Sequence, residues 1–242
     1  QEQAQAHYRK VMDGIRIDTP SPLVDAGFVS AVLGLEYGWS TGGWLEDLQG
    51  YDTYWGDEYQ IDASLHLGGP VWGARTTEAM RVWAAEPQAG VPSGGVIPGQ
   101  DTFVRRDGLP YWLLTLSRYA TAFGQAAEPI LDAAWQSGSH GLEAMLVDLA
   151  SVHKDGLIGL GEHNNMFLYQ SDHISLPGSA LSPSIFVAGL LHSLSPLAAA
   201  RNQTERAERW EQTARKMAST IDDTLWLGSH WASLRDPTNM TA

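Results

Sequence analysis

The C-terminal part of the chain contains two consecutive helical patterns of opposite character. The segment SPSIFVAGLLHSLSPLAAA, residues 182–200, is apolar nearly all round, which is typical of a helix covered on most of its surface. The next segment, Thr204 to Leu225, carries apolar residues every three or four positions with charged residues between them. These are Ala207, Trp210, Ala214, Met217, Ile221 and Leu225. This spacing predicts an amphipathic helix that packs on one side, and the two segments together predict a hairpin of an inner and an outer helix.

Weaker copies of the same arrangement occur along the rest of the chain. Ser21-Pro22 and Ser182-Pro183 are typical helix starts, and Gly124 is a plausible helix stop. The patterns predict an all-α fold of about four hairpins. The expected helices cover residues 2–16, 22–37, 58–68, 74–86, 109–124, 128–153 (with a break expected near Gly138 to Gly141), 183–199 and 204–226.

Three long connections separate these helices, at residues 39–57, 87–108 and 154–182. They are rich in Gly, Trp, Tyr and acidic residues. Connections of this length are uncommon in compact domains unless they carry function. If inner helices alternate with outer ones, all three connections reach the same end of the bundle. Short extended pieces are expected within residues 94–106, 155–161 and 164–172.

Composition excludes several classes of protein. The formal net charge of −13 opposes sequence-independent binding to nucleic acid or to anionic membranes, so we expect neither partner. The chain has no cysteine, which excludes disulfides, thiolate nucleophiles and Cys-ligated metals. It has no apolar run of membrane-spanning length. We expect a soluble protein, either cytoplasmic or secreted, that is a piece of a longer chain.

Aromatic and acidic residues gather in the connections. Of the ten tryptophans, we expect Trp39, Trp44, Trp55 and Trp72 to meet a ligand or to cap a pocket, because they lie near glycines. The stretch YDTYWGDEYQID, Tyr51 to Asp62, is open to two interpretations. It is either a hydrated acidic loop or a platform that holds a polar ligand.

Two further groups of polar residues have a structural and a functional interpretation. Asp107 stands where a helix N-cap is expected, and its position alone favours this structural interpretation over that of a catalytic acid. Within DGLIGLGEHNN, residues 155–165, the candidates are Glu162, His163 and Asn164, which suit either a hydrogen-bonded turn or contacts to a ligand. No metal-binding motif is present, so we expect no metal and no cofactor.

Four short motifs in a fixed order carry a family resemblance. They are W-G-D-E at 55–58, E-A-M-R at 78–81, G-V-I-P at 95–98 and D-G-L-P-Y-W at 107–112. Over residues 20–226 the chain resembles the six-hairpin glycosidases, most closely glycoside hydrolase family 63 and the amylo-glucosidase domain of glycogen debranching enzymes. The resemblance implies an incomplete (α/α)6 toroid, a single partial catalytic domain over residues 1–242, and further domains of the same parent chain.

The resemblance also implies an activity and a set of residues. It implies an exo-acting, inverting glycoside hydrolase that removes a terminal sugar from a carbohydrate substrate. It implies that Asp107 is the general acid, with Trp112 beside it. The residues implied in substrate binding are Tyr54, Trp55, Asp57, Glu58, Trp112, Glu162, His163 and Asn164. In this chain Asp57 stands where the debranching pattern has arginine.

The second catalytic carboxylate is not recognisable in this chain. It lies beyond the chain, or Glu58 or Glu162 replaces it, or the chain is inactive. Other six-hairpin enzymes remain alternatives, namely a rhamnosidase, an unsaturated glucuronyl hydrolase or an epimerase. A carbohydrate-binding or scaffold protein without catalysis is the alternative from a different class.

Overall fold

The computed structural model describes residues 2–40, 43–44, 57–85, 108–152, 156–158, 179–232 and 234–235. Most of these residues are helical, which confirms the all-α class. The helices are α1 (Glu2–Val11), α2 (Pro22–Gly38), α3 (Asp57–Leu67), α4 (Gly69–Ala85), α5 (Gly108–Phe123), the 3-10 turn η1 (Gly124–Ala127), α6 (Glu128–Val152), α7 (Leu181–Ala200) and α8 (Thr204–Leu225).

Two small antiparallel pairs of strands accompany the helices. Strand β1 (Trp39–Ser40) pairs with β2 (Gly43–Trp44), and β3 (Ser179–Ala180) pairs with β4 (Leu234–Arg235). The extended pieces expected within 94–106 and 164–172 lie outside the described residues. Of the third, at 155–161, the structure describes only 156–158.

The helices agree with the sequence pattern except at three places. Helix α1 ends at Val11 rather than at residue 16, and the chain turns at Gly14, whose φ is +76°. Helix α4 begins at Gly69 rather than at residue 74, directly after the single turn residue Gly68. Helix α6 continues through Gly138, where a break was expected, because this glycine packs closely against α5.

The larger helices form two rows. Helices α3, α5 and α7 contact one another in that order and make the inner row, while α4 and α6 are neighbours in an outer row with α8. Each inner helix packs on the outer helix that follows it in the chain, so the pairs are α3/α4, α5/α6 and α7/α8. Helix α5 is central, and it buries Trp112, Leu113, Leu116 and Tyr119 completely or nearly so.

Side-chain contacts give the direction of α3, α4 and α5. A Cβ on Gly73 of α4 would lie 3.8 Å from the ring of Phe123 of α5, and one turn later the Tyr119 hydroxyl donates to Thr77 Oγ1 at 3.2 Å. Residue numbers rise in α4 as they fall in α5, so these helices are antiparallel. Only Gly68 separates α3 from α4, which makes that pair antiparallel too. Helices α3 and α5 are therefore parallel.

The same reasoning gives the direction of α7. Trp135 Nε1 of α6 donates to Gln203 Oε1 just before α8 at 3.2 Å, and Arg206 Nε of α8 donates to Glu143 Oε1 of α6 at 3.0 Å. Residue numbers rise together, so α6 and α8 are parallel. Short connections make α5/α6 and α7/α8 antiparallel pairs. All three inner helices therefore run in one direction and all three outer helices run in the other.

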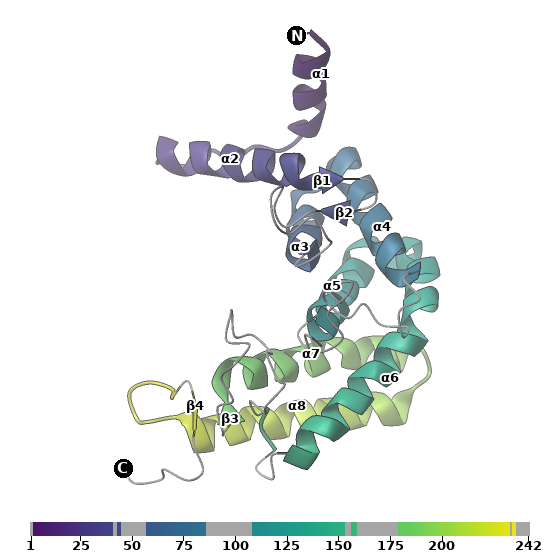
Figure 1. Ribbon diagram of the computed structural model, residues 1–242, viewed down its shortest axis with the longest axis vertical. Coiled ribbons are helices and arrows are strands. Elements are labelled where there is room, and N and C mark those ends of the chain that lie inside the picture. The colour runs from purple at the N-terminus through teal and green to yellow at the C-terminus, as the bar shows by residue number, and fades with distance from the viewer. Residues whose placement is uncertain are drawn as a thin grey trace, which may run out of the picture.

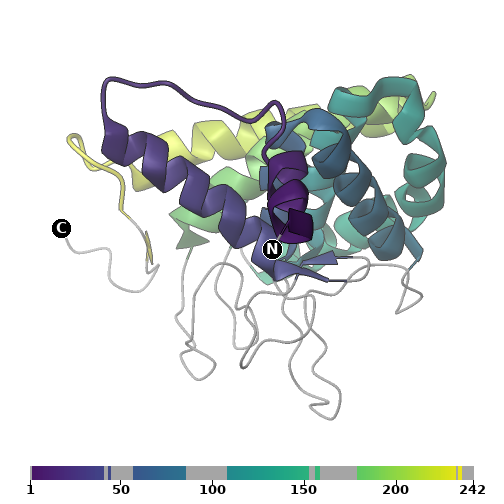
Figure 2. The same cartoon turned by 90° about the horizontal axis from the view of Figure 1, so that it is seen from above.

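This arrangement defines one end of the two rows, which we call the start face. Helices α3, α5 and α7 begin there, at Asp57, Gly108 and Leu181, and α4 and α6 end there, at Ala85 and Val152. The rows follow a curved arc, with α1 and α2 at one end and the α7/α8 pair at the other (Figure 1). Seen from above, α1 and α2 lie in front of the two rows (Figure 2).

Helix α7 departs from the expectation that most of its surface is covered. Its contacts with α5 and α8 bury Val187, Leu190, Leu191 and Leu194. On another flank Ile185 is 53% exposed. The apolar sequence of α7 therefore exceeds what its described neighbours cover.

Candidate functional site

Most of the predicted site residues lie outside the described part of the chain. This holds for the proposed acid Asp107 and for the substrate-binding candidates Tyr54, Trp55, Glu162, His163 and Asn164. Their roles stay predictions.

Asp57 and Glu58 are the first two residues of α3. The backbone of α3 places them on the start face, although their side chains are not described. Helix α5, the parallel neighbour of α3, begins at Gly108, the residue that follows Asp107 in the sequence. Asp57 and Glu58 therefore belong to the beginning of one inner helix, and Asp107 directly precedes the beginning of the adjacent inner helix in the sequence.

The segment before Glu162 is tied to the beginning of α7. Leu157 and Ile158 are buried, and the Ile158 N–H donates to Ser184 Oγ in the first turn of α7 at 3.0 Å. Leu157 packs with Ile221 and Leu225 of α8. Residues 156–158, which precede the candidates Glu162, His163 and Asn164 in the sequence, therefore lie close to the start face.

Trp112 packs α5 against α6. Its side chain is 1% exposed, and an added Cβ on Gly138 would lie 3.0 Å from Trp112 Cζ3 and 2.9 Å from Leu113 Cδ2. The indole ring therefore lies between the two rows. Its Nε1 is buried without a hydrogen-bond partner among the described residues. The geometry shows a packing role, and a role in binding substrate stays a prediction.

Two tryptophans that we expected to meet a ligand are core residues. Trp44 is fully buried, and its Nε1 donates to the Leu35 carbonyl at 2.9 Å. Trp72 is also buried and lies within α4 rather than in a connection, with its Nε1 donating to the Val11 carbonyl at 3.0 Å. The expectation for these two is wrong, because neighbouring glycines do not by themselves show that a segment is a loop. Trp55 lies outside the described residues.

A charged pair that sequence analysis did not identify joins the inner helices α3 and α5. Arg118 Nη1 of α5 donates to Asp62 Oδ2 of α3. The other carboxylate oxygen, Asp62 Oδ1, is buried, lies 3.9 Å from His66 Nε2, and has no hydrogen-bond partner in the described part of the chain. Asp62 follows Glu58 by four residues, so both lie on one face of α3. This four-residue spacing is the sequence signal that could have identified Asp62 as a candidate site residue.

A second ionic cluster holds α1, α2 and α4 together. The Glu36 carboxylate of α2 accepts hydrogen bonds from Arg75 of α4 and from His7 of α1, the latter at 2.6 Å. The guanidinium of Arg75 also lies 5.2 Å from the ring centroids of Trp39 and Trp72. Burial raises the pKa of Glu36, but the hydrogen bonds from Arg75 and His7 outweigh it and hold the pKa below its usual value.

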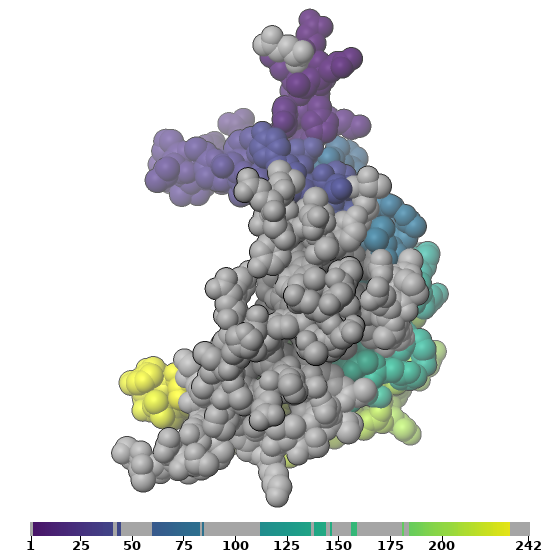
Figure 3. Space-filling model, in the orientation of Figure 1, coloured from purple at the N-terminus to yellow at the C-terminus, as the bar shows by residue number. Residues whose placement is uncertain are grey.

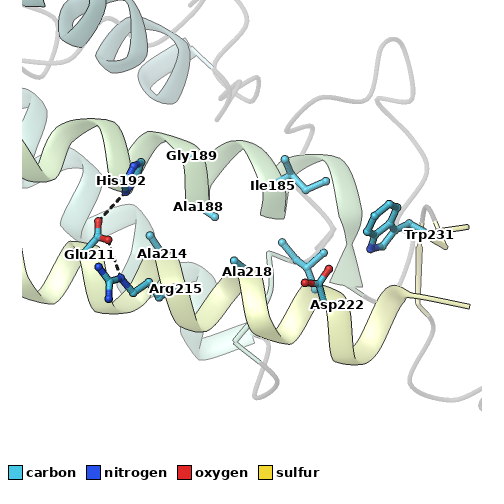
Figure 4. A pocket seen from close by; sticks show the side chains of 11 residues that line it. Ile185, Ala188, Gly189, His192, Glu211, Ala214, Arg215, Ala218, Asp222 and Trp231 are labelled. Atoms are coloured by element: carbon cyan, nitrogen blue, oxygen red, sulfur yellow. Dashed lines mark hydrogen bonds and ion pairs between the residues drawn. The ribbon is translucent and has the colours of Figure 1, made fainter. Parts of the chain in front are cut away.

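A groove of about 520 Å³ lies between α7 and α8. Figure 4 shows its side chains. Glu211 accepts hydrogen bonds from His192 at 2.9 Å and from Arg215 at 2.8 Å, and these bonds lower the pKa of its carboxyl group. Glu211 therefore stays ionised at neutral pH and is unsuited to donate a proton.

Two classes of feature are missing from the described residues. These residues hold no group of three or more His, Asp or Glu side chains placed to bind a metal ion. None of the helices named above is long and apolar enough to span a bilayer.

Two comparisons with known proteins identify no relative of this chain. None of the protein-family models matches this chain, and no curated protein matches it either. The proposed function is therefore argued from the residues and from the arrangement of the helices.

Proposed function

We propose that this protein is a glycoside hydrolase that removes a terminal sugar with inversion, and that its helical pairs are part of an (α/α)6 toroid. One observation carries the proposal. Helices α3 and α5 are parallel and in contact, so both begin at the same end of the molecule. The first turn of α3 contains Asp57 and Glu58, and Asp107 directly precedes α5 in the sequence.

The spacing of neighbouring helices suits the chemistry. Packed helix axes lie about 8–10 Å apart. In inverting glycosidases the two carboxyl groups lie about 6.5–9.5 Å apart, which leaves room for the attacking water. The beginnings of two adjacent parallel helices can therefore present two carboxylates at this separation.

In the proposed reaction the proton of Asp107 goes to the glycosidic oxygen as the bond between that oxygen and the anomeric carbon breaks. A second carboxylate takes a proton from a water molecule, whose oxygen attacks the anomeric carbon from the opposite face. Glu58 or Glu162 supplies this base, or it comes from a part of the protein beyond this chain. Asp57 and Glu58 accept hydrogen bonds from sugar hydroxyls, and the rings of Tyr54 and Trp55 stack on the sugar.

The test is release of monosaccharide from a panel of aryl glycosides and oligosaccharides, with the anomer of the first product read by NMR. We expect inversion at the anomeric carbon. Replacing Asp107 with Asn should lower kcat by about 10²–10⁴-fold, since general acid catalysis contributes that much. The matched control is Asp18→Asn, because Asp18 is exposed and lies before α2, and this variant should keep full activity.

Calorimetric titration with the same sugars separates the proposed enzyme from a carbohydrate-binding protein. Binding without turnover by a protein that also includes any sequence beyond residue 242 contradicts the hydrolase and supports the binding protein. Turnover that Asp107→Asn leaves unchanged contradicts the role of Asp107 as the acid.

A further inference from the structure

A short hairpin after α8 exposes two tryptophans that are in contact with each other. Trp226 and Trp231 form an antiparallel bridge, and their ring centroids lie 4.5 Å apart with the ring planes at 58°. The two residues are 42% and 46% exposed, and Leu227, which follows the first of them, is 59% exposed. We call residues 226–231 the Trp hairpin. It projects from one side of the molecule, in yellow, in the space-filling view (Figure 3).

Backbone hydrogen bonds fix the shape of the Trp hairpin. The Leu227 N–H donates to the His230 carbonyl at 2.8 Å, and the Ala232 N–H donates to the Leu225 carbonyl at 2.7 Å. Gly228 supplies the positive φ of +87° that the tight turn between them requires. The two indole rings are therefore held in position before a ligand arrives, which lowers the entropy cost of binding one.

The Trp hairpin belongs to the start face. Helix α8 is parallel to α6, so it ends on that face at Leu225, directly before the hairpin. After the hairpin the chain enters β4, which pairs with β3 just before α7 begins. The hairpin therefore lies at the same end of the helices as the first turn of α3 and the beginning of α5. It is one helical pair further along the arc than α5 (Figure 1).

An exposed carboxylate stands beside the indole rings. Asp222, in the last turn of α8, lines the same groove as Trp231 and Ile185 (Figure 4). Among the described residues it has no hydrogen-bond or ion-pair partner, so its oxygens can accept hydrogen bonds from a ligand. At the turn of the hairpin, the exposed Ser229 hydroxyl lies 2.9 Å from Nδ1 of the exposed His230 ring. Hydrogen-bonding groups therefore border the aromatic surface.

These groups together favour one class of ligand. Exposed aromatic surface beside hydrogen-bond acceptors matches a sugar, whose ring presents C–H groups on a face and hydroxyl donors around its edge. The unpaired carboxylate and the net charge of −13 oppose an anionic ligand or an anionic lipid surface. A purely apolar partner would remove water from Asp222 without giving it a hydrogen-bond donor, which costs free energy.

We propose that the Trp hairpin binds a neutral oligosaccharide, with Trp231 stacked on a sugar ring and Asp222 accepting hydrogen bonds from the hydroxyls of that sugar. Trp226 supports Trp231 from the side. As a substrate site, this inference rests on the proposed function. The hairpin then holds sugars that lie beyond those at the predicted cleavage site, because it shares the start face with the beginning of α5 but belongs to the next pair. The enzyme accordingly prefers oligosaccharides to short glycosides.

The first test is calorimetric titration of the complete chain with maltohexaose, cellohexaose, mannohexaose and xylohexaose. Asp107→Asn is present in every sample, so that cleavage does not consume the ligand. We expect at least one hexasaccharide to bind, and we expect Trp231→Ala to raise its Kd at least about tenfold, because stacking on the indole ring is lost. Trp231→Tyr keeps an aromatic ring and should recover most of the affinity.

The controls separate sugar binding from a structural role of the hairpin. Asp222→Ala removes the acceptor without touching the indole rings and should raise the Kd about two- to tenfold. Tyr37→Ala is the matched control, because Tyr37 is an aromatic residue that is 61% exposed on α2, at the other end of the arc. It should leave the Kd unchanged. Circular dichroism checks that all variants keep their helices.

The second test is kinetic and uses the chain with Asp107 intact. Trp231→Ala should lower kcat/KM for the hexasaccharide about tenfold and leave kcat/KM for an aryl monoglycoside unchanged. Turnover and a Kd that Trp231→Ala does not alter overturn this inference and leave the hydrolase standing. Binding that depends on Trp231 in a protein without turnover supports the inference and counts against the hydrolase alone. Failure of all four hexasaccharides to bind overturns the inference, as does a dimer that Trp231→Ala abolishes while no sugar binds.

Discussion

Gly138 fixes the distance between the inner and outer helices of the central pair. The atoms that an added methyl group would meet are Leu113 Cδ2 at 2.9 Å and the rigid ring carbon Trp112 Cζ3 at 3.0 Å. We predict that Gly138→Ala lowers the free energy of unfolding by about 1–3 kcal/mol, which is typical of overpacking. Denaturation in urea measures it.

Gly73 provides the control, because it is also inside a helix and next to α5. Its added Cβ would lie 3.8 Å from Phe123, an ordinary contact distance. Gly73→Ala should raise the free energy of unfolding by about 0.5–1 kcal/mol through helix propensity. Equal destabilisation by both substitutions would contradict the close packing at Gly138.

Glu36 makes the junction of α1, α2 and α4 depend on pH. Its pKa is lowered in the folded protein, so its contribution is present above the unfolded pKa of about 4.3 and is lost as the pH falls through the folded value. We predict that Glu36→Gln lowers the free energy of unfolding by about 2–3 kcal/mol at pH 7, between the values for surface and buried ion pairs. The difference from wild type should shrink as the pH falls below about 4, as followed by urea denaturation at several pH values.

Glu78 is the matched control for this experiment. It also pairs with an arginine, Arg81, but the side chain of Glu78 is 41% exposed, against 9% for Glu36. Glu78→Gln should leave stability nearly unchanged at pH 7. An equal loss in both variants would mean that burial of Glu36 does not matter.

Individual buried residues could be predicted where a helical period encodes them. All six residues expected on the buried side of residues 204–225 are buried in α8. The tryptophans show the limit of this approach. Trp44 and Trp72 bond the carbonyls of Leu35, nine residues away, and of Val11, 61 residues away, and such contacts leave no period in the sequence.

At the scale of elements, Arg206 joins α8 to α6. Its guanidinium donates to Glu143, to Ser139 Oγ and to Gln203 Oε1, and its side chain is mostly buried. We predict that Arg206→Met lowers the free energy of unfolding by about 1–3 kcal/mol, because buried acceptors lose their donor. Thermal denaturation and urea denaturation should give the same decrease in the free energy of unfolding.

Arg81→Met is the corresponding control, since the partner of Arg81 among the described residues is Glu78 on the same helix and Arg81 is exposed. It should not change stability measurably. If Arg206→Met also leaves the free energy of unfolding unchanged, these hydrogen bonds do not stabilise the contact between α6 and α8.

The existence and type of the helices could be predicted, and their ends could be predicted within a few residues. The exceptions have local causes. Helix α6 continues through Gly138, which packs closely against α5, where two glycines predicted a break, and Gly68 and Gly69, both with positive φ, turn the chain from α3 into α4. The Asp62–Arg118 pair was missed because it depends on which helices are neighbours.

The candidate site could be predicted only as a set of residues. Its acids were chosen by motif order, and the parallel direction of α3 and α5 supports that choice at the level of the backbone. The sequence predicted this direction only on the condition that inner helices alternate with outer ones, and the contacts of Thr77 with Tyr119 and of Trp135 with Gln203 establish it.

At the scale of the whole molecule, burial is distributed unevenly along the arc. Helix α5 is buried on most of its surface, whereas α1 buries only Val11. We predict that backbone amides of α5 exchange with deuterium most slowly and that those of α1 exchange fastest, because local opening costs least where few apolar contacts are lost. Exchange measured by mass spectrometry at low protein concentration tests this, and equal protection of α1 and α5 would contradict it.

The parallel repetition of the pairs has a consequence for how stability adds up. In the described part of the chain the main contacts of each pair are with the pair before it and the pair after it, as in a repeat protein, so the free energy is close to a sum over pairs and the interfaces between successive pairs. The middle pair α5/α6 takes part in two such interfaces, and α7/α8 takes part in one with its described neighbours. A defect of equal size therefore costs more at Gly138 than in α8, and unfolding is expected to begin at the ends of the arc and proceed towards its middle.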